Sequence, residues 1–231
     1  LRGVTHALDG AVTAGALEAR TTTGEITLGA RLEVASDAVL TAGGGATLAE
    51  VSAGALTVSA GADLAQAGAL DVGGLAEVSA GGAVALGPAT VGALTLTAGD
   101  GAALADLTVA GAATLEAGGA AMLGAVSAGS LELRAASLAV GPMTVGGLVA
   151  LEIGAPLTLG PVAAGELAAT VQGAFGQSAA FDVAGAARIE ATGAVTLADP
   201  ANRFGGPMAL TAAAAEIAAA GPLHLAGARL G

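Results

Sequence analysis

The sequence predicts an all-β protein: a parallel β-helix, or β-solenoid, of about 12 coils of roughly 19 residues each, with three short strands per coil. Two observations carry this prediction. A glycine recurs about every 19 residues, and each copy is followed by a short segment in which apolar and polar residues alternate. Such a fixed period is typical of proteins built by stacking one unit, so the array is expected to span residues 1–231 as a single domain. The anchor glycines are Gly54, Gly74, Gly92, Gly111, Gly129, Gly147, Gly165, Gly185 and Gly206.

The segment after each anchor glycine is the first expected strand of a coil. Its second and fourth residues are apolar, whereas its third and fifth are mostly Thr, Ser, Glu or Arg. Alternation with a period of two places one face of a strand in the core and the other in solvent. The expected inward residues are Leu56, Val58, Leu94, Leu96, Ala113, Leu115, Leu131, Leu133, Val149, Leu151, Ala187, Ile189, Met208, Leu210, Leu223 and Leu225.

Two further strands are expected to complete each coil. A second apolar burst follows most anchors after a turn, as in Leu138 and Val140, and a valine such as Val51 precedes the next anchor. Three strands and three turns describe a coil of roughly triangular section. Glycine at one corner fits a bend that requires a positive φ, which only glycine adopts at little cost.

The ends of the array are less regular. Near the N-terminus the pattern extends to Leu32 and Val34, with Ala30 in place of the anchor glycine. Near the C-terminus, residues 212–220 are rich in alanine, the best helix former, so this stretch is either a strand or a helical turn. The strand pattern resumes at 222–225, where His224 is expected to face solvent.

Composition and charge exclude several kinds of partner. Of 231 residues, 54% are hydrophobic and 1% aromatic, and 19 carboxylates face seven basic residues, all of them arginine. Nucleic acids and anionic membranes bind clustered basic side chains, so neither is expected as a partner. The longest uncharged stretch, 78–99, is interrupted by glycines and Pro88, which argues against membrane insertion. The lack of cysteine is compatible with export, and Leu1 in place of methionine indicates a segment of a longer protein.

No catalytic, cofactor-binding or metal-binding residue is predicted. The two histidines, His6 and His224, lie at opposite ends of the array and are not expected to share a site. Four Val-Ser-Ala-Gly segments supply serines, but none lies in a nucleophile motif. These serines are interpreted as corner residues that hydrogen-bond the turns. The chain is therefore interpreted as a protein that is not an enzyme and uses no cofactor.

Stacking is expected to place equivalent outward residues of successive coils in columns. Glu116, Arg134 and Glu152 occupy the fifth position after consecutive anchors, and they alternate in sign. They form either a ladder that fixes the register of the coils or three solvated charges, whose pairs contribute about 0–1 kcal/mol each. Thr95 and Thr97 provide one threonine pair of the kind that an ice-binding face repeats, but the neighbouring coils are not expected to continue it.

The Gly-x-Leu-x-Val strands, the Val-Ser-Ala-Gly segments and above all Asn202-Arg-Phe204-Gly-Gly206 resemble repeats of filamentous-haemagglutinin-type exoproteins, in which an Asn-x-Phe-x-Gly motif recurs. The resemblance covers essentially the whole chain. It implies a right-handed parallel β-helix and export by two-partner secretion through an outer-membrane pore. It also implies a place outside a Gram-negative bacterium, or on its surface, as an adhesin or stalk.

Three functions are compatible with these observations. The first is a non-enzymatic extracellular fibre segment, the shaft or spacer of a large secreted bacterial exoprotein. The second is a self-assembling filament subunit that stacks end to end on its own copies, as in a biofilm fibre or a bactofilin-like polymer. The third, a polysaccharide-acting β-helix enzyme, is disfavoured because no insertion is long enough to form a cleft. A receptor on a host or neighbouring cell is not identified by any residue.

Overall fold

A computed structural model describes residues 2–3 and 5–231 of the protein. Every regular element among these residues is a β-strand. The strands run parallel and stack as a β-solenoid of about 12 turns of about 19 residues, which confirms the predicted fold. Within the described ranges there is no helix long and apolar enough to cross a membrane.

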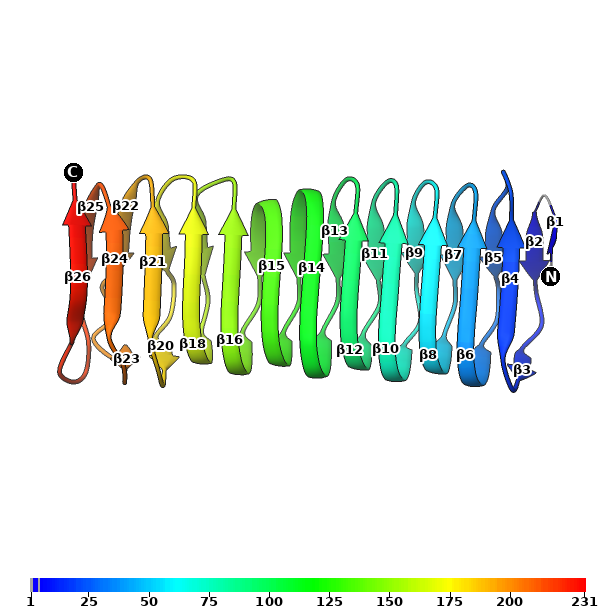
Figure 1. Cartoon of the computed structure of the whole chain (residues 1–231), viewed down its shortest axis with the longest axis horizontal. Coiled ribbons are helices and arrows are strands. Elements are labelled where there is room, and N and C mark those ends of the chain that lie inside the picture. Colours follow the sequence, from blue (N-terminus) through cyan, green and yellow to red (C-terminus); the bar gives the residue numbers. More distant parts are fainter. Residues whose placement is uncertain (1, 4) are drawn as a thin grey trace. The chain divides into compact units, whose positions relative to one another are not determined.

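The chain divides into two compact units, Leu1–Gly119 (unit 1) and Ala120–Gly231 (unit 2). Unit 1 contains β1 (Arg2–Gly3), β2 (His6–Leu8), β3 (Val12–Ala14), β4 (Leu17–Thr21), β5 (Ile26–Leu28), β6 (Leu32–Ala42), β7 (Ala46–Leu48), β8 (Val51–Ala60), β9 (Leu64–Gln66), β10 (Leu70–Ala80), β11 (Val84–Leu86), β12 (Ala89–Ala98), β13 (Ala102–Leu104) and most of β14 (Leu107–Leu123). Within each unit, Figure 1 shows the long strands side by side and the short strands behind them.

Unit 2 repeats the same turn of the solenoid. Its strands, after the last residues of β14, are β15 (Val126–Val140), β16 (Met143–Ile153), β17 (Leu157–Leu159), β18 (Val162–Val171), β19 (Phe175–Gln177), β20 (Phe181–Val183), β21 (Ala187–Ala191), β22 (Ala194–Leu197), β23 (Arg203–Phe204), β24 (Met208–Ala212), β25 (Ala214–Ile217) and β26 (Leu225–Leu230). The short strands β17, β19, β22 and β25 form a separate four-stranded parallel sheet.

A typical turn consists of one long bent strand and one short strand. In the long strands β8, β10 and β12, the residues before and after the anchor glycine pair with the neighbouring turn, and the register shifts between the two halves. Two of the three predicted strands are therefore continuous through the bend. We call the half before the anchor glycine the first arm and the half after it the second arm. The short strands form the third side.

Alternating burial of the second arms builds the core of each unit. Leu94 and Leu96 in unit 1 and Leu131 and Leu133 in unit 2 are all 1–2% exposed, as the alternation predicts. Each large aliphatic side chain buried in this way contributes about 1.5–3 kcal/mol. Many other inward positions hold alanine, which contributes less, so the core is slender and its stability is shared among neighbouring turns.

The anchor glycines are required by close approach between turns rather than by a positive φ. Among the described residues only Gly173 has a positive φ, at 126°, so the expected conformation of the anchors is wrong. A Cβ on Gly74 would lie 2.8 Å from the carbonyl oxygen of Gly54, and a Cβ on Gly92 would lie 2.7 Å from that of Gly74. Most anchors therefore pack directly on the backbone of the preceding turn, where a side chain does not fit without a shift of that backbone.

Unit 1 contains a second glycine ladder, which the sequence analysis does not identify. It lies at the corner that follows the second arm and consists of Gly43, Gly61, Gly81, Gly99 and Gly118. A Cβ at any of the last four would overlap the carbonyl oxygen of the preceding member. Two of the Val-Ser-Ala-Gly segments end in this ladder, so their glycines belong to a different corner from the anchors.

The expected start of the repeat near the N-terminus is wrong by one arm. Leu32 pairs with Val51 and Val34 pairs with Ala53, so both belong to a first arm and not to a second arm. The anchor position of this turn is held by Ser36, whose hydroxyl donates to the carbonyl oxygen of Gly15 at 2.8 Å. Ala30-Arg-Leu32-Glu-Val34 imitates the alternation that follows an anchor, because both arms alternate.

The C-terminal turns also differ in part from expectation. Ala214–Ile217 is a strand, so the helical alternative for residues 212–220 is wrong. The last strand is Leu225–Leu230 rather than 222–225. Leu225 is 50% exposed, which contradicts its predicted inward place. In β15 the burst at Leu138 and Val140 is only half-buried.

Candidate interaction surface

The second arms present two outward columns in each unit. In unit 1, column 1 consists of Glu18, Val39, Thr57, Glu77, Thr95 and Thr114, and column 2 of Arg20, Thr41, Ser59, Ser79, Thr97 and Glu116. In unit 2, column 1 consists of Glu132, Ala150, Ala168, Arg188, Ala209 and Gly227, and column 2 of Arg134, Glu152, Thr170, Glu190, Thr211 and Arg229. Neighbours in a column are about 4.8 Å apart, and the two columns are about 6.8 Å apart.

Ion pairs mark two turns of unit 2. Arg134 Nε lies 3.0 Å from Glu152 Oε2, and Arg134 Nη2 lies 3.5 Å from Glu132 Oε1. The Arg188 guanidinium pairs with Glu190 through Nε at 3.0 Å. The predicted stacking of Arg134 on Glu152 is thus confirmed, whereas its extension to Glu116, which lies in unit 1, stays a prediction. The Arg134 side chain is 56% exposed, so each such pair contributes about 0–1 kcal/mol to folding.

Small residues separate these two charged turns. Between them, column 1 holds Ala150 and Ala168, and a shallow groove follows these alanines toward Thr170. Beyond Arg188 and Glu190, a second groove crosses Ala209, Thr211, Gly227 and Arg229. The outward face of unit 2 is therefore ridged, with charged turns standing above turns that carry small side chains in column 1.

The same face of unit 1 begins with one ion pair in β4, where Arg20 Nε lies 2.6 Å from Glu18 Oε1, and then presents mostly hydroxyl groups and carboxylates. The Thr57 hydroxyl donates to Glu77 Oε2 at 3.4 Å, and a groove runs past these residues to Ser79, Thr95 and Thr97. The expectation that the neighbours do not continue the Thr95–Thr97 pair holds only in part. Thr114 lies beside Thr95, and two hydroxyl residues, Thr57 and Ser59, recur two turns earlier, but Glu77 interrupts the array.

The serines of the Val-Ser-Ala-Gly segments lie on strands and not in corners, contrary to expectation. Ser59 and Ser79 are column 2 residues of the second arms, and Ser52 and Ser127 are outward residues of first arms. The reason is that each of these segments is itself part of an arm, with its valine and alanine facing the core. None of these serines therefore closes a turn.

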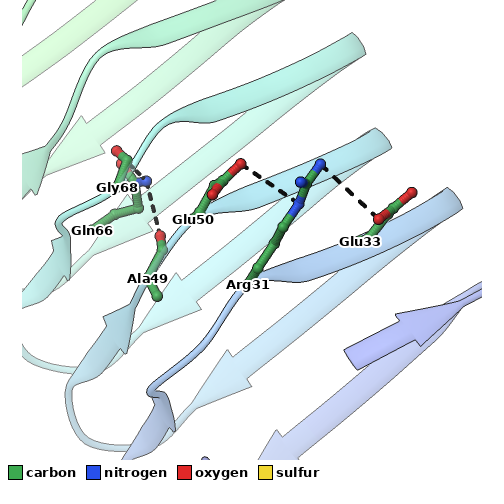
Figure 2. Close-up of polar contacts among 6 residues, drawn as sticks. All are labelled: Arg31, Glu33, Ala49, Glu50, Gln66 and Gly68. Carbon is green, nitrogen blue, oxygen red and sulfur yellow. Dashed lines mark hydrogen bonds and ion pairs between the residues drawn. The ribbon is translucent and has the colours of Figure 1, made fainter. Parts of the chain in front are cut away.

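A further ion cluster lies where two first arms of unit 1 begin (Figure 2). Arg31 Nε is 3.5 Å from Glu50 Oε1, and Arg31 Nη2 is 4.0 Å from Glu33 Oε2. These side chains are about half exposed. Their geometry resembles that of Arg134 in unit 2, because in both places one arginine contacts the glutamate two residues away in its own turn and a glutamate of the neighbouring turn.

Buried amides hold one corner of each unit. Gln66 occupies an inward position of a short strand, and its Nε2 donates to the carbonyl oxygens of Ala49 at 3.0 Å and Gly68 at 2.7 Å (Figure 2). Its Oε1 accepts from the Gly87 N–H at 3.0 Å. Gln66 is not predicted by the strand pattern, although a polar residue at an inward position is a signal that could identify it.

In unit 2, Gln177 holds the same strand position as Gln66, and the side chain bonded to it is that of Asn202, which is fully buried. Asn202 exchanges two hydrogen bonds of 2.9 Å with the side chain of Gln177. Its Oδ1 accepts from the Phe181 N–H at 2.8 Å, and its Nδ2 donates to the carbonyl oxygens of Leu197 and Ala218. The Asn-x-Phe-x-Gly segment thus closes a corner between turns, which is a structural role.

The two histidines lie in different units. His6, in unit 1, is half-buried, and its Nε2 lies 3.2 Å from the carbonyl oxygen of Arg20. His224, in unit 2, is exposed as expected, and its carbonyl oxygen accepts from the Met208 N–H at 2.8 Å. Residues 2–3 and 5–231 contain no group of three or more His, Asp or Glu side chains placed to hold a metal ion. The expectation that the chain has no catalytic or cofactor site stays a prediction.

Comparison with known proteins gives one match. A family described as repeats of unknown function (DUF5649) matches residues 44–90 and 146–211. One matched segment lies in each unit, and the second contains both Asn202 and the Arg188–Glu190 pair. No curated protein and no solved structure matches the chain. The match supports repetition without indicating an activity, and the resemblance to filamentous-haemagglutinin-type repeats stays an expectation.

Proposed function

We propose that the chain is a non-enzymatic structural segment of an extracellular fibre, a shaft or spacer that carries an adhesive surface. The observation that supports this function best is the uninterrupted repetition of one turn. The longest connection between described strands in either unit is 218–224, and most connections contain two or three residues. Loops that could fold over a substrate are absent from the described residues, and the outward residues lie on extended faces instead.

The construction of each turn suits a load-bearing segment. Neighbouring turns are joined by parallel ladders along both arms, as between β16 and β18. Anchor glycines bring the backbones together at the bend, and buried amides such as Asn202 join the corner of one turn to the next. Because every turn is held by its neighbours, stability grows with the number of turns.

The proposed extracellular location rests on the resemblance to filamentous-haemagglutinin-type exoproteins. In that scheme the chain passes an outer-membrane secretion pore of a Gram-negative bacterium before it folds, and the lack of cysteine removes any need for disulfide formation. Its partners are then the pore during export and a host or neighbouring cell afterwards. Neither nucleic acid nor membrane insertion belongs to this proposal.

Antibodies raised against the folded chain test the location. On intact cells of the organism that produces it, they should stain the surface or detect the chain in the medium, and external protease should remove the staining. Staining that requires permeabilised cells would contradict the extracellular role. A cytoplasmic protein detected in the same cells serves as the control for cell integrity.

A second candidate function is an end-to-end filament subunit. The observation that favours it is the repeated parallel pairing of one turn with the next, as between β16 and β18. The same pairing between copies would continue the stack from one chain to the next. Electron microscopy of the purified chain separates the two functions, because long threads of constant width support polymerisation and short separate particles support a passive segment.

A further inference from the structure

The outward face of unit 2 has an unusual property when its two columns are compared turn by turn. In two turns the columns hold opposite charges: Glu132 beside Arg134, and Arg188 beside Glu190. In the other turns column 1 holds a small residue and column 2 a larger one. These turns are Ala150 with Glu152, Ala168 with Thr170, Ala209 with Thr211, and Gly227 with Arg229. No turn places two like charges or two large uncharged side chains side by side.

This arrangement is self-complementary about one particular axis. A two-fold axis that runs along the stack, midway between the columns, places column 1 of one copy opposite column 2 of another in every turn. Arg188 then faces Glu190 of the second copy, and Glu190 faces its Arg188. In the same way, each alanine of column 1 faces the larger column 2 residue of the corresponding turn.

We propose that unit 2 pairs through this face with unit 2 of a second copy of the chain, about this two-fold axis. The two sheets then face each other with their stacks parallel, in the manner of paired sheets whose side chains interdigitate. Charge complementarity selects the partner, because each of the two charged turns brings two opposite pairs together. The pairing does not depend on the proposed extracellular function.

The borders of the face support the same axis. In β16 the axis passes over Leu151, and Leu148 and Gly154 lie three residues to either side of it. Leu148 is 41% exposed. The two-fold axis places it opposite the exposed Gly154 of the second copy, which directly follows β16. An exposed leucine and an exposed glycine at these equivalent borders fit each other in the proposed pair.

The alanine turns give this pairing an energetic basis that the ion pairs alone lack. Exposed ion pairs within one chain contribute little, and those at an interface mainly select the partner and its orientation. Burial of Ala150, Ala168 and the exposed Leu148 removes apolar surface from water, which favours association. The charged turns then fix which turns face each other.

Charge substitutions at Arg188 and Glu190 test the proposal. Sedimentation of the full chain at about 0.15 M salt, over about 1–100 µM protein, should show a monomer–dimer equilibrium. Arg188→Glu places like charges across the axis and should raise the dissociation constant about tenfold or more. The swap Arg188→Glu with Glu190→Arg restores opposite charges across the axis and within the chain, and should bring the constant back to within about threefold of the original.

These two positions are suitable for a swap because their column neighbours, such as Ala168 and Thr211, are uncharged. Arg31→Glu makes the same change of charge on the first arm of unit 1 and is the matched control, with no expected effect. Chains with Arg188→Glu mixed with chains carrying Glu190→Arg should form a heterodimer. A chain that stays monomeric over the whole range, or a dimer that the swap weakens as much as Arg188→Glu, would overturn the proposal.

Thiol cross-linking tests the axis itself, since the chain contains no cysteine. Ala168→Cys chains mixed with Thr170→Cys chains should be joined by a short bismaleimide, because column 1 faces column 2. Each variant alone should cross-link poorly. If each variant cross-links efficiently with itself and the mixture gives no additional product, the columns face their own kind and the proposed axis is wrong.

Discussion

Unit 1 presents mostly hydroxyl groups and carboxylates on its second arms, with a single ion pair between Glu18 and Arg20, whereas unit 2 presents two ion-paired turns separated by alanines at the same positions of the turn. The inward residues differ little, since Leu96 in unit 1 and Leu133 in unit 2 are both 1% exposed. The fold is therefore specified by the inward alternation and the close backbone contacts at glycine. The outward residues are left free to differ, and they determine what each unit can bind.

The two units also differ in net charge. Unit 1 contains 12 of the 19 carboxylates but only three arginines, whereas unit 2 contains seven carboxylates and four arginines. No basic residue occurs between Arg31 and Arg134. Copies of unit 1 therefore repel one another more strongly than copies of unit 2, which fits an association through unit 2.

The largest expected effect comes from a charge placed in the shared core. Leu96→Glu in unit 1 and Leu133→Glu in unit 2 should each destabilise their unit by about 3–5 kcal/mol, because a buried carboxylate has no partner there. Thermal unfolding by circular dichroism and limited proteolysis measure the loss. The outward controls Thr97→Gln and Thr170→Gln should change stability by less than about 0.5 kcal/mol. Equal effects at inward and outward positions would show that the two units do not share this core.

A methyl group added to the second glycine ladder of unit 1 should cost nearly as much. Gly61→Ala places a Cβ against the carbonyl oxygen of Gly43, so we expect a loss of about 2–4 kcal/mol in chemical denaturation. In unit 2, Gly160 has open space within 4 Å of an added Cβ. Gly160→Ala should therefore be neutral, or stabilising by about 0.5 kcal/mol. A tolerated Gly61→Ala would contradict the close contact between turns.

The two buried amides should differ in the cost of their removal. Asn202→Ala leaves the Phe181 N–H and the carbonyl oxygens of Leu197 and Ala218 without this partner, at an expected cost of about 3 kcal/mol. Gln66→Leu should cost about 1 kcal/mol, since the Gly87 N–H keeps a backbone acceptor. Urea denaturation of both variants checks the order. A larger loss of stability for Gln66→Leu than for Asn202→Ala would contradict the expected order.

The smallest expected effect concerns the surface ion pairs. Arg134→Ala in unit 2 and Arg31→Ala in unit 1 should each change the free energy of unfolding by less than about 1 kcal/mol, because the side chains are about half exposed. This change in the free energy of unfolding should be smaller still at 1 M salt, because salt screens the interaction between exposed charges. Denaturation at low and high salt measures it, and a loss well above this value would mean that the pairs hold the turns together.

The sequence predicts the solenoid because the alternation in the arms is strong and repeated. It fails where two parts of the turn look alike. The pattern places Leu32 and Val34 in the wrong arm because first and second arms alternate in the same way. The role of the anchor glycines is also not predictable from the sequence. Their close contact with the preceding turn arises only when the turns stack, and a linear pattern does not show which backbones then meet.

The candidate surface is less predictable than the fold. The spacing of the anchors places Arg134, Glu152 and Glu190 in one column, as the register confirms. The complementary column is hidden in the sequence because Ala150 and Ala168 carry no chemical signal of their own. Only the register between turns shows that each small residue lies beside a larger one, and that the two charged turns carry opposite orders of charge.

Single-cysteine labelling across both units tests most directly whether they share one turn. The eight positions are Thr95, Leu96, Thr97, Ala98, Glu132, Leu133, Arg134 and Ala135, in a chain that has no other cysteine. We predict fast reaction with a water-soluble maleimide at 95, 97, 132 and 134 and slow reaction at 96, 98, 133 and 135, with the same alternation in both units. Uniform labelling, or alternation that is present in one unit and absent or opposite in phase in the other, would contradict the common turn.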